Sequence, residues 1–334
     1  VGLNYVIYNG GARKYSFERL KTQYQLSNAQ KRQQIETTLI DVYTQFFTVA
    51  RTQESLNTLK EAYSISKERL ARVKVQKEYG QKTKLDVLNA TVDANSDSIN
   101  IINVEVDLAN GKRNLNFLLG RDINTAFEVN NAVVLDLAMD KEKLKAAMDS
   151  NNVQLKQVQI NRQLAAYDLR VNKAGWLPNV SASASYGLDF RDNGQVGFFQ
   201  NQQSAGLNAG VNLSWNLFDG GSTQTRIQNA QIALKSQELN EERLKLNLNN
   251  QLEVFWAEYV TQKTIMSNEE LNIEVSQQNF LKSKEQFNLG QITSLDFRQA
   301  QLNLINTQLN LLNAKYSAKL AELRLKQFAG LLIE

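Results

Sequence analysis

The sequence predicts a membrane α+β fold, in which strands pooled from several protomers form a transmembrane β-barrel that continues into a long, coiled-coil-like helical tunnel. Three observations lead to this prediction. Apolar and polar residues alternate in three short stretches, as in strands with one apolar face. Two of these stretches run into more than 60 residues with a helical apolar period. The strand-to-helix pattern also occurs twice, displaced by 210 residues.

Composition narrows the function classes. The 334 residues include one proline and 16 glycines, so few turns are available and very long helices are favoured. Cysteine and histidine are both absent, which excludes disulfides and thiolate nucleophiles and removes the commonest general base. We therefore predict no catalytic residues, no cofactor and no metal site. The 38 basic and 34 acidic residues nearly balance, so no nucleic-acid partner is expected, and no apolar run is long enough for a transmembrane helix.

The first repeat is predicted to span 1–120. Gly10 and Gly11 end its strand and begin its first helix. Gly80 can adopt the left-handed conformation that ends a helix, and Thr83 can cap the next one. In chain order the predicted elements are a strand (1–9), a long helix (12–79) and a second helix (83–120).

Residues 121–150 have mixed character and separate this repeat from a second one, predicted over 151–330. Pro178 ends the first helix there, because proline cannot continue a helix. Apolar residues in the last helix step by three and four, which predicts a coiled-coil-like contact. The predicted elements are a helix (153–174), a strand (179–191), a loop (192–206), a strand (207–218), a long helix (221–289) and a helix (293–329).

Landmarks of the two repeats keep one spacing, so the helices between them have similar lengths. The displacement of 210 places Gly10-Gly11 on Gly220-Gly221, Gly80 on Gly290, Asp86 on Asp296 and Gly120 on Gly330. Applied to the helix at 153–174 and the strand at 179–191, it predicts that roughly 60 further residues, carrying a helix and a strand, precede Val1.

The predicted dimensions fit a membrane-spanning tube. A helix of about 65 residues is roughly 100 Å long, and strands of about 11 residues can cross a bilayer at barrel tilt. One apolar and one Ser/Asn/Gly-rich face are typical of a water-filled barrel. Because strand edges in lipid must be closed, several protomers have to pool their strands.

Taken together, these motifs resemble the TolC family of outer-membrane efflux proteins, also called outer membrane factors. The resemblance rests on the duplicated strand, Asp/Asn-Gly-Gly and long-helix motif, on Leu177-Pro178, and on Asn288-Leu289-Gly290 followed by Leu295-Asp296. It implies a homotrimer in the outer membrane of a Gram-negative bacterium, with a twelve-stranded barrel and a large periplasmic helical tunnel. It also implies that 121–150 belongs to an equatorial belt.

The resemblance implies a passive export duct of a tripartite efflux pump or type I secretion system. Its partners would be outer-membrane lipid, a periplasmic adaptor (membrane fusion) protein and an inner-membrane transporter of proton-driven or ABC type. A periplasmic structural or adaptor coiled-coil protein is the alternative, which explains the helices but not the alternating strands. An enzyme is a third class, but Asp86 and Asp296 belong to symmetric copies of one turn and not to a mixed catalytic cluster.

Under this resemblance the two helix turns form the periplasmic aperture and the adaptor-docking tip. Asp86 and Asp296 match the family's entrance carboxylates, and in a trimer each would form a ring that attracts cations. A solvated Asp in the first turn of a helix, favoured by the helix dipole, is the alternative. Ile292 and Gln299 stand where the family pattern places a basic and a second acidic residue. The tip residues are Gly80, Asp86, Gly290 and Asp296.

Two further sets of residues mark the membrane boundary. The strand-to-helix joints need glycine, because the chain turns sharply within two or three residues, and Asp219 is placed to cap the helix that follows. The joint residues are Gly10, Gly11, Asp219, Gly220 and Gly221. Aromatic residues on the outward strand faces and beside the joints are predicted to face lipid or to lie at the membrane interface, with packing in a core as the alternative. They are Tyr5, Trp176, Tyr186, Trp215 and Phe218.

Overall fold

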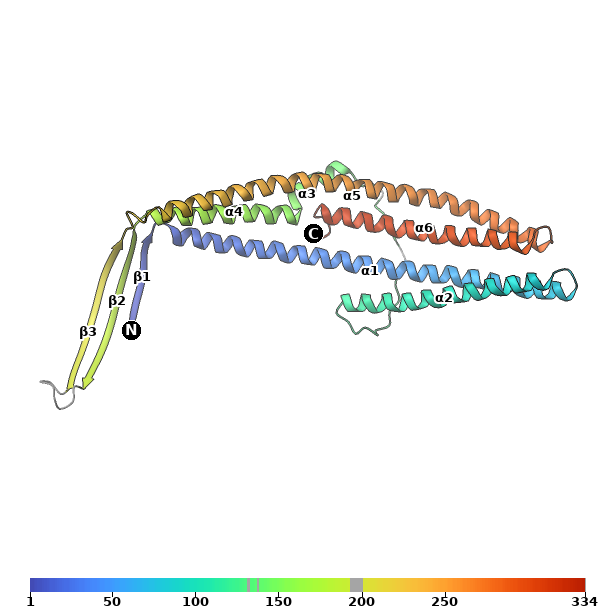
Figure 1. The fold of residues 1–334 in the computed structure, drawn as a ribbon, viewed down its shortest axis with the longest axis horizontal. Coiled ribbons are helices and arrows are strands. Elements are labelled where there is room, and N and C mark those ends of the chain that lie inside the picture. Colours follow the sequence, from blue (N-terminus) through green and yellow to red (C-terminus); the bar gives the residue numbers. More distant parts are fainter. Residues whose placement is uncertain (131–132, 137, 193–200, 334) are drawn as a thin grey trace. The chain divides into compact units, whose positions relative to one another are not determined.

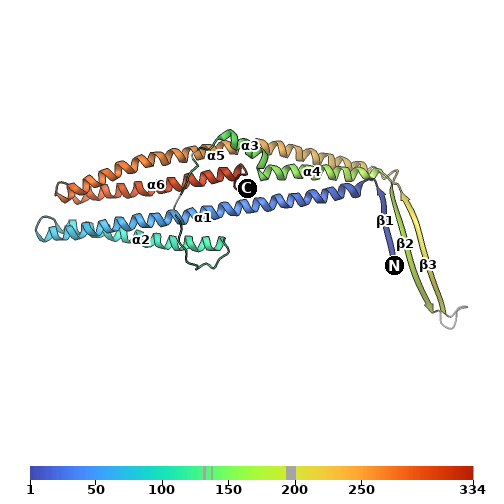
Figure 2. The ribbon, with the colours of Figure 1, turned by 180° about the vertical axis from the view of Figure 1, so that it is seen from behind.

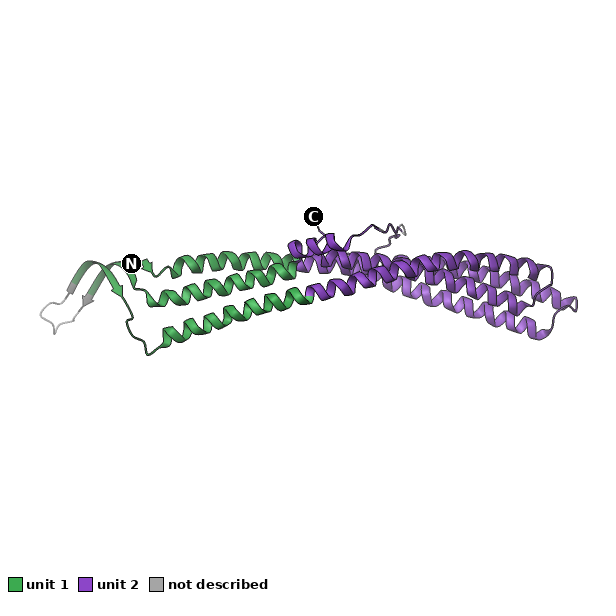
Figure 3. Ribbon diagram, turned by 90° about the horizontal axis from the view of Figure 1, so that it is seen from above, with its two compact units in different colours: residues 1–32, 153–247 green, residues 33–152, 248–334 purple. Residues whose placement is uncertain are grey.

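The described residues of the computed structural model fall into two compact units (Figure 3). The structure describes residues 1–130, 133–136, 138–192 and 201–333. Unit 1 comprises residues 1–32 and 153–247, and unit 2 comprises residues 33–152 and 248–334. Each unit draws on both predicted sequence repeats, so the compact units cut across the repeats.

Unit 1 contains a three-stranded antiparallel sheet in the order β1-β2-β3 (Figure 1). The strands are β1 (Gly2–Asn9), β2 (Asn179–Asp192) and β3 (Asn201–Ser214). The register pairs apolar residues with apolar residues across the strands. Tyr5 of β1 and Val211 of β3 both pair with Ala182 of β2. The next row joins Asn4, Ser183 and Gly210. Since side chains alternate between faces, the register builds one apolar and one polar face.

The apolar face of this sheet is exposed. Leu207 is 73% and Val211 72% exposed, and Tyr186 and Leu188 on β2 are also exposed. A sheet normally buries such a face against another layer. The sheet therefore presents an exposed apolar face that would be stable against lipid or other apolar groups.

The predicted strand over 207–218 and the loop over 192–206 were wrong at their boundaries. β3 begins at Asn201, because residues 201–206 pair with residues 187–192 in spite of their polar composition. β3 ends at Ser214, whose partner Asn179 is the first residue of β2. Pro178 precedes Asn179 and has no N–H for a further ladder bond. Residues 193–200 of the predicted loop lie outside the described residues.

Helices complete unit 1. The first residues of α1 (Ala12–Glu78) and of α5 (Ser222–Asn288) belong to it, together with α4 (Val153–Lys173). The helix predicted over 153–174 ends in a 3₁₀ turn, η1 (Ala174–Trp176), which is separated from Pro178 by Leu177. Arg19 of α1 and Asp168 of α4 form an ion pair at 2.6 Å.

Unit 2 is built from two helical hairpins, which are visible in Figures 1 and 2. The first hairpin joins α1 to α2 (Lys84–Leu118), and the second joins α5 to α6 (Ser294–Phe328). A buried cluster that includes Val49 and Leu108 packs α1 on α2. A second cluster, with Phe47 and Tyr316, packs α1 on α6. The hairpins therefore share a core.

The segment between the repeats attaches to the second hairpin. The backbone N–H of Asp136 donates to Glu322 Oε2 at 3.0 Å, and the Tyr259 hydroxyl donates to the Asp136 carbonyl at 2.7 Å. α3 (Lys141–Asn151) follows, with Asp140 as its N-cap and Met148 buried. No strand forms in the part of 121–140 that the structure describes.

The internal repeat is visible in the backbone. Among the described residues, positive φ angles occur only at glycine, and the eight such glycines form four pairs separated by 210 residues. The pairs are Gly10 and Gly220, Gly11 and Gly221, Gly80 and Gly290, and Gly120 and Gly330.

None of the described helices combines the length and the apolar character needed to cross a bilayer.

Candidate functional site

The first hairpin ends in a compact turn at its tip. Gly80 has φ of 74° and its N–H bonds to the Lys77 carbonyl, which closes the end of α1. Thr83 and Asp86 then form a capping box, in which each residue satisfies the other's backbone N–H. Asp86 Oδ2 accepts from the Thr83 N–H and from the Thr83 hydroxyl, both at 2.8 Å.

The tip of the second hairpin repeats this geometry. Gly290 has φ of 75°, and its N–H bonds to the Phe287 carbonyl. Asp296 Oδ2 accepts from the Thr293 N–H at 3.1 Å and from the Thr293 hydroxyl at 2.6 Å. Each predicted tip carboxylate is thus held by a threonine three residues earlier.

These hydrogen bonds keep both carboxylates charged. The backbone and then the hydroxyl of Thr83 lower the pKa of Asp86 below its ordinary value. The hydroxyl and then the backbone of Thr293 do the same to the pKa of Asp296. Asp296 is exposed and Asp86 is half-buried. Capping therefore leaves both groups as negative charges at the surface.

Each tip also exposes two large apolar side chains at equivalent positions. Tyr79 and Leu85 are 79% and 65% exposed in the first tip. Leu289 and Leu295 are 66% and 77% exposed in the second. Exposed apolar residues that gather at one place are typical of a contact surface for another protein.

A groove of about 390 Å³ lies between α2 and α6 near the tips. Asp86 is on its α2 side and Gln299 on its α6 side, with Arg69 and Arg298 among its other lining residues. The remaining lining residues are Asn89, Val92, Asp93, Ser294, Leu295 and Leu302.

A buried polar network that includes the groove residue Arg298 was not predicted from the sequence. Arg298 of α6 pairs with Asp97 of α2 through two parallel contacts, Nη1 to Oδ2 at 2.8 Å and Nη2 to Oδ1 at 2.7 Å. Gln301 donates to the Ala62 carbonyl at 2.8 Å and to Ser66 Oγ at 3.0 Å. All five residues are buried. The network therefore ties α6 of the second hairpin to both helices of the first.

A second arginine extends the network toward the tip of the second hairpin. Arg69 of α1 pairs with Asp93 and donates to the Ser294 carbonyl at 3.2 Å. The sequence did carry a signal for this network. Arg298 occupies the place between Leu295 and Leu302 where the three-and-four apolar spacing requires another apolar residue.

The strand-to-helix joints share one capping geometry and differ in their surroundings. Asp219 Oδ2 accepts from the Thr223 N–H at 2.8 Å, and Asn9 Oδ1 accepts from the Arg13 N–H at 3.1 Å. Asn9 lies 210 residues before Asp219, so the repeat could have identified this second cap. A Cβ on Gly10 would lie 2.7 Å from the Ala174 carbonyl oxygen, whereas one on Gly220 would meet open space. Gly11 and Gly221 also have positive φ.

The predicted interface aromatics are exposed but do not lie at one level. The Trp215 indole N–H donates to the Trp176 carbonyl at 3.0 Å, which joins these two residues at the joint end of the sheet. Phe218, 86% exposed, follows Trp215. Tyr186 pairs with Leu207, roughly 20 Å farther along the strands at about 3.3 Å per residue. Tyr5 pairs with Ala182, between these two levels.

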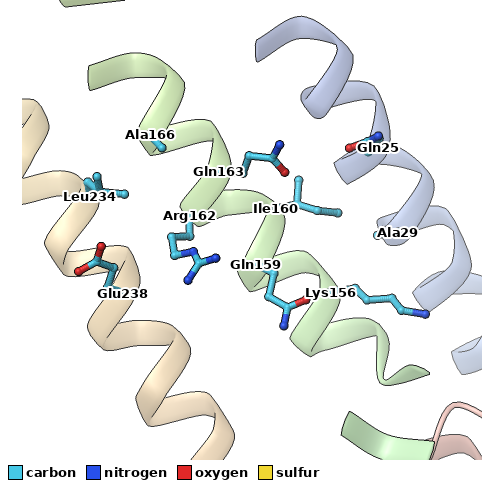
Figure 4. A pocket seen from close by; sticks show the side chains of 10 residues that line it. All are labelled: Gln25, Ala29, Lys156, Gln159, Ile160, Arg162, Gln163, Ala166, Leu234 and Glu238. Atoms are coloured by element: carbon cyan, nitrogen blue, oxygen red, sulfur yellow. The ribbon is translucent and has the colours of Figure 1, made fainter. Parts of the chain in front are cut away.

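A larger groove, of about 650 Å³, lies among α1, α4 and α5 in unit 1 (Figure 4). Lys156 and Arg162 of α4 line it, with Glu238 from α5. Arg162 pairs with Glu241 at 3.2 Å, so that charge is neutralised locally. Within the described ranges, no three acidic side chains gather where they could hold a metal ion.

Comparison with known families gives a match that covers most of the chain. The model of the outer membrane efflux protein family matches residues 1–121 and 147–331. Outer membrane protein TolC of Vibrio cholerae is 21% identical over 292 residues, which cover 86% of this chain. The chain spans 66% of the length of that relative.

Solved structures of outer-membrane channels share the fold. VceC of Vibrio cholerae superposes with a TM-score of 0.82 at 15% identity, over 98% of this chain and 78% of VceC. CmeC of Campylobacter jejuni gives a TM-score of 0.82 at 16% identity, over 100% of this chain and 71% of CmeC. The predicted α+β combination of long helices with antiparallel strands is therefore confirmed.

Proposed function

The chain belongs to the outer membrane efflux protein family, and on that premise we propose that it acts as the outer-membrane duct of an export system. Such a duct is a passive conduit and not an enzyme. We propose that it carries cargo from the periplasm to the exterior, as part of a tripartite efflux pump or a type I secretion system.

The observation that carries this proposal is the three-stranded sheet with one exposed apolar face. Its register sets Tyr5, Ala182 and Val211 in one row and Asn4, Ser183 and Gly210 in the next. This alternation is what a barrel wall with lipid outside and water inside requires. Because open sheet edges are not stable in lipid, three copies would pool their strands into one closed barrel. Trp176, Trp215 and Phe218 would then lie at the periplasmic interface.

In this proposal the long helices of the three copies enclose a periplasmic tunnel, and the hairpin tips form its entrance. The exposed pairs Tyr79 with Leu85 and Leu289 with Leu295 support docking of a periplasmic adaptor there. An inner-membrane transporter, proton-driven or of ABC type, would supply the energy. Rings of Asp86 and Asp296 would favour cations at the aperture.

The alternative is a periplasmic coiled-coil protein without a barrel. It accounts for the two hairpins but leaves the exposed apolar face of the sheet without a partner. Mass measurement in detergent and conductance in planar bilayers separate the two. We expect a particle of three chains that forms ohmic channels. A monodisperse monomer that needs no detergent and gives no conductance would overturn the duct proposal.

The aperture proposal needs a control, because Asp296 also caps a helix. Asp296→Ala removes the charge together with the capping box, whereas Thr293→Ala breaks the box and keeps the carboxylate. We expect single-channel block by hexaamminecobalt(III) to weaken in Asp296→Ala and to persist in Thr293→Ala. Equal block in both variants and the parent would place the constriction elsewhere.

A further inference from the structure

A small cavity lies where α1 of the first hairpin packs against α5 and α6 of the second. Its volume is about 60 Å³. A single water molecule needs about 15 Å³, and pockets for drug-sized ligands begin at roughly 300 Å³. The cavity therefore has room for a small ion but not for an organic cargo molecule. Its lining residues are Ile65, Glu68, Arg69 and Arg72 of α1, Lys284, Phe287 and Asn288 of α5, and Phe297 of α6.

Aromatic rings form one wall of this cavity. Phe287 and Phe297 are 4% and 3% exposed, and their rings stack with centroids 4.9 Å apart. Both belong to a buried cluster with Val73 of α1. Because these side chains exclude water, charges beside them interact more strongly than charges at an open surface.

Three cationic side chains line the same cavity. Arg69 and Arg72 come from α1, and Lys284 comes from α5. Arg69 is 3% exposed, and the other two are half-buried. Cations that converge on a confined space repel one another, and a buried charge without a partner is costly.

Acidic side chains offset only two of these three positive charges. Asp93 pairs with Arg69, and the exposed Glu68 is the one carboxylate among the described residues that line the cavity. Within the part of the chain that the structure describes, Arg72 and Lys284 form no ion pair. The surroundings of the cavity therefore carry an excess of one positive charge.

The same cations hold hydrogen-bond donors without acceptors. Arg69 uses both Nη atoms within the chain, but its buried Nε–H has no partner. Arg72 uses two N–H groups of its guanidinium on Asn288. Lys284 has no acceptor for its ammonium group among the described residues. A ligand that accepts hydrogen bonds would satisfy these donors, and the excess charge selects an anion over water.

We propose that this cavity binds a small monovalent anion, of the size of chloride, between Arg69, Arg72 and Lys284. The anion accepts hydrogen bonds from side chains of α1 and α5, and thereby joins the first hairpin to the second. The site lies wholly within one chain, so it exists whether or not the chain forms a duct.

The stability of the protein in different salts tests this proposal. The full chain in detergent would be unfolded by heat in sodium chloride and in sodium gluconate at equal ionic strength. Gluconate is too large for a cavity of about 60 Å³. A ligand that binds only the folded state raises Tm, so chloride at about ten times its Kd should add about 2–4 °C.

Lys284→Gln separates this effect from general salt effects. The substitution removes the excess charge, so the difference in Tm between chloride and gluconate should be smaller than in the parent by that same amount. Lys282→Gln is the matched control, because Lys282 is exposed and lies about 200° around α5 from Lys284. It should keep the full chloride response. A response that is lost in both variants, or kept in both, would overturn the proposal.

Bromide locates the ion directly and needs no substitution. Crystals of the parent protein transferred into sodium bromide should show an anomalous-scattering peak in the cavity bounded by Arg69, Arg72 and Lys284. Peaks only outside this cavity would overturn the assignment. A peak in the cavity without any chloride response in solution would identify an adventitious ion only, and would overturn it as well.

Discussion

The two hairpins end in the same turn, with Gly80 and Gly290 at φ of 74° and 75° and a Thr-Asp capping box at each tip. Yet α6 of the second hairpin is buried at Arg298 and Tyr316, whereas α2 of the first exposes the equivalent residues Leu88 and Val106. The shared features are bonds between residues a few positions apart. The hairpins differ in burial where one hairpin contacts the other. A repeated sequence therefore reproduces the local turns and caps, but not the tertiary contacts of each copy.

The largest difference between the hairpins should come from breaking the buried ion pair. Asp97→Asn leaves the buried Arg298 with only the 3.9 Å acidic contact from its Nε to Asp93 Oδ1, and should lower the free energy of unfolding by about 3–5 kcal/mol. The equivalent Thr307→Ala removes the half-buried hydrogen bond to Ser276 and an exposed one to the Asn303 carbonyl, and should cost about 0.5–1.5 kcal/mol. Urea unfolding followed by helical circular dichroism measures both. Equal losses would show that the network contributes no special stability.

The joints allow a second comparison at matched glycines. Gly220→Ala forces a left-handed backbone on alanine, at about 1–2 kcal/mol. Gly10→Ala adds contacts at 2.7 Å and 2.8 Å to Ala174 and Leu177, and such overpacking costs roughly 1–3 kcal/mol more. Thermal unfolding in detergent should therefore rank Gly10→Ala below Gly220→Ala. The reverse order would mean that η1 yields easily to the added methyl group.

The tips should respond alike, because their capping boxes are alike. Thr83→Ala and Thr293→Ala each remove one N-cap side chain and should each lower stability by about 1 kcal/mol. Hydrogen exchange of the first-turn amides of α2 and α6 measures the local loss. A loss at one tip only would show that tertiary contacts, and not the cap, hold the other.

The smallest effect concerns pH. The pKa of Asp86 and that of Asp296 are lower in the folded chain than the value of about 3.9 for an unfolded aspartate. Their stabilising effect is therefore fully present above that value and is lost as the pH falls through the folded pKa. Hydrogen-exchange protection of the first-turn amides of α2 and α6, corrected for intrinsic exchange, should therefore decrease as the pH falls below about 3.9. Asp86→Asn should abolish the pH dependence at the first tip, and its persistence there would assign it to another group.

The sequence predicted the boundaries of the long helices to within one or two residues. Glycine, Thr-Asp capping boxes and proline end or begin a helix through interactions with residues close to them in the chain. β3 was misplaced because its limits depend on pairing. Residues 201–206 form a strand because they pair with β2. β3 ends at Ser214 because Pro178, the residue before β2, has no N–H to continue the pairing. The polar network was missed for the same reason, since Arg298 and Asp97 are 201 residues apart.

By itself, the sequence determined the twofold repeat, the alternating strands, the long helices and the turns that end them, because each depends on residues close together in the chain. The tertiary structure decided which of the two equivalent helices, α2 or α6, buries this stripe of residues. α6 packs into the first hairpin and buries Arg298 with Asp97, while the equivalent stripe on α2 stays exposed. Contacts between segments some 200 residues apart depend on how the hairpins meet, which no local pattern of apolar and polar residues specifies.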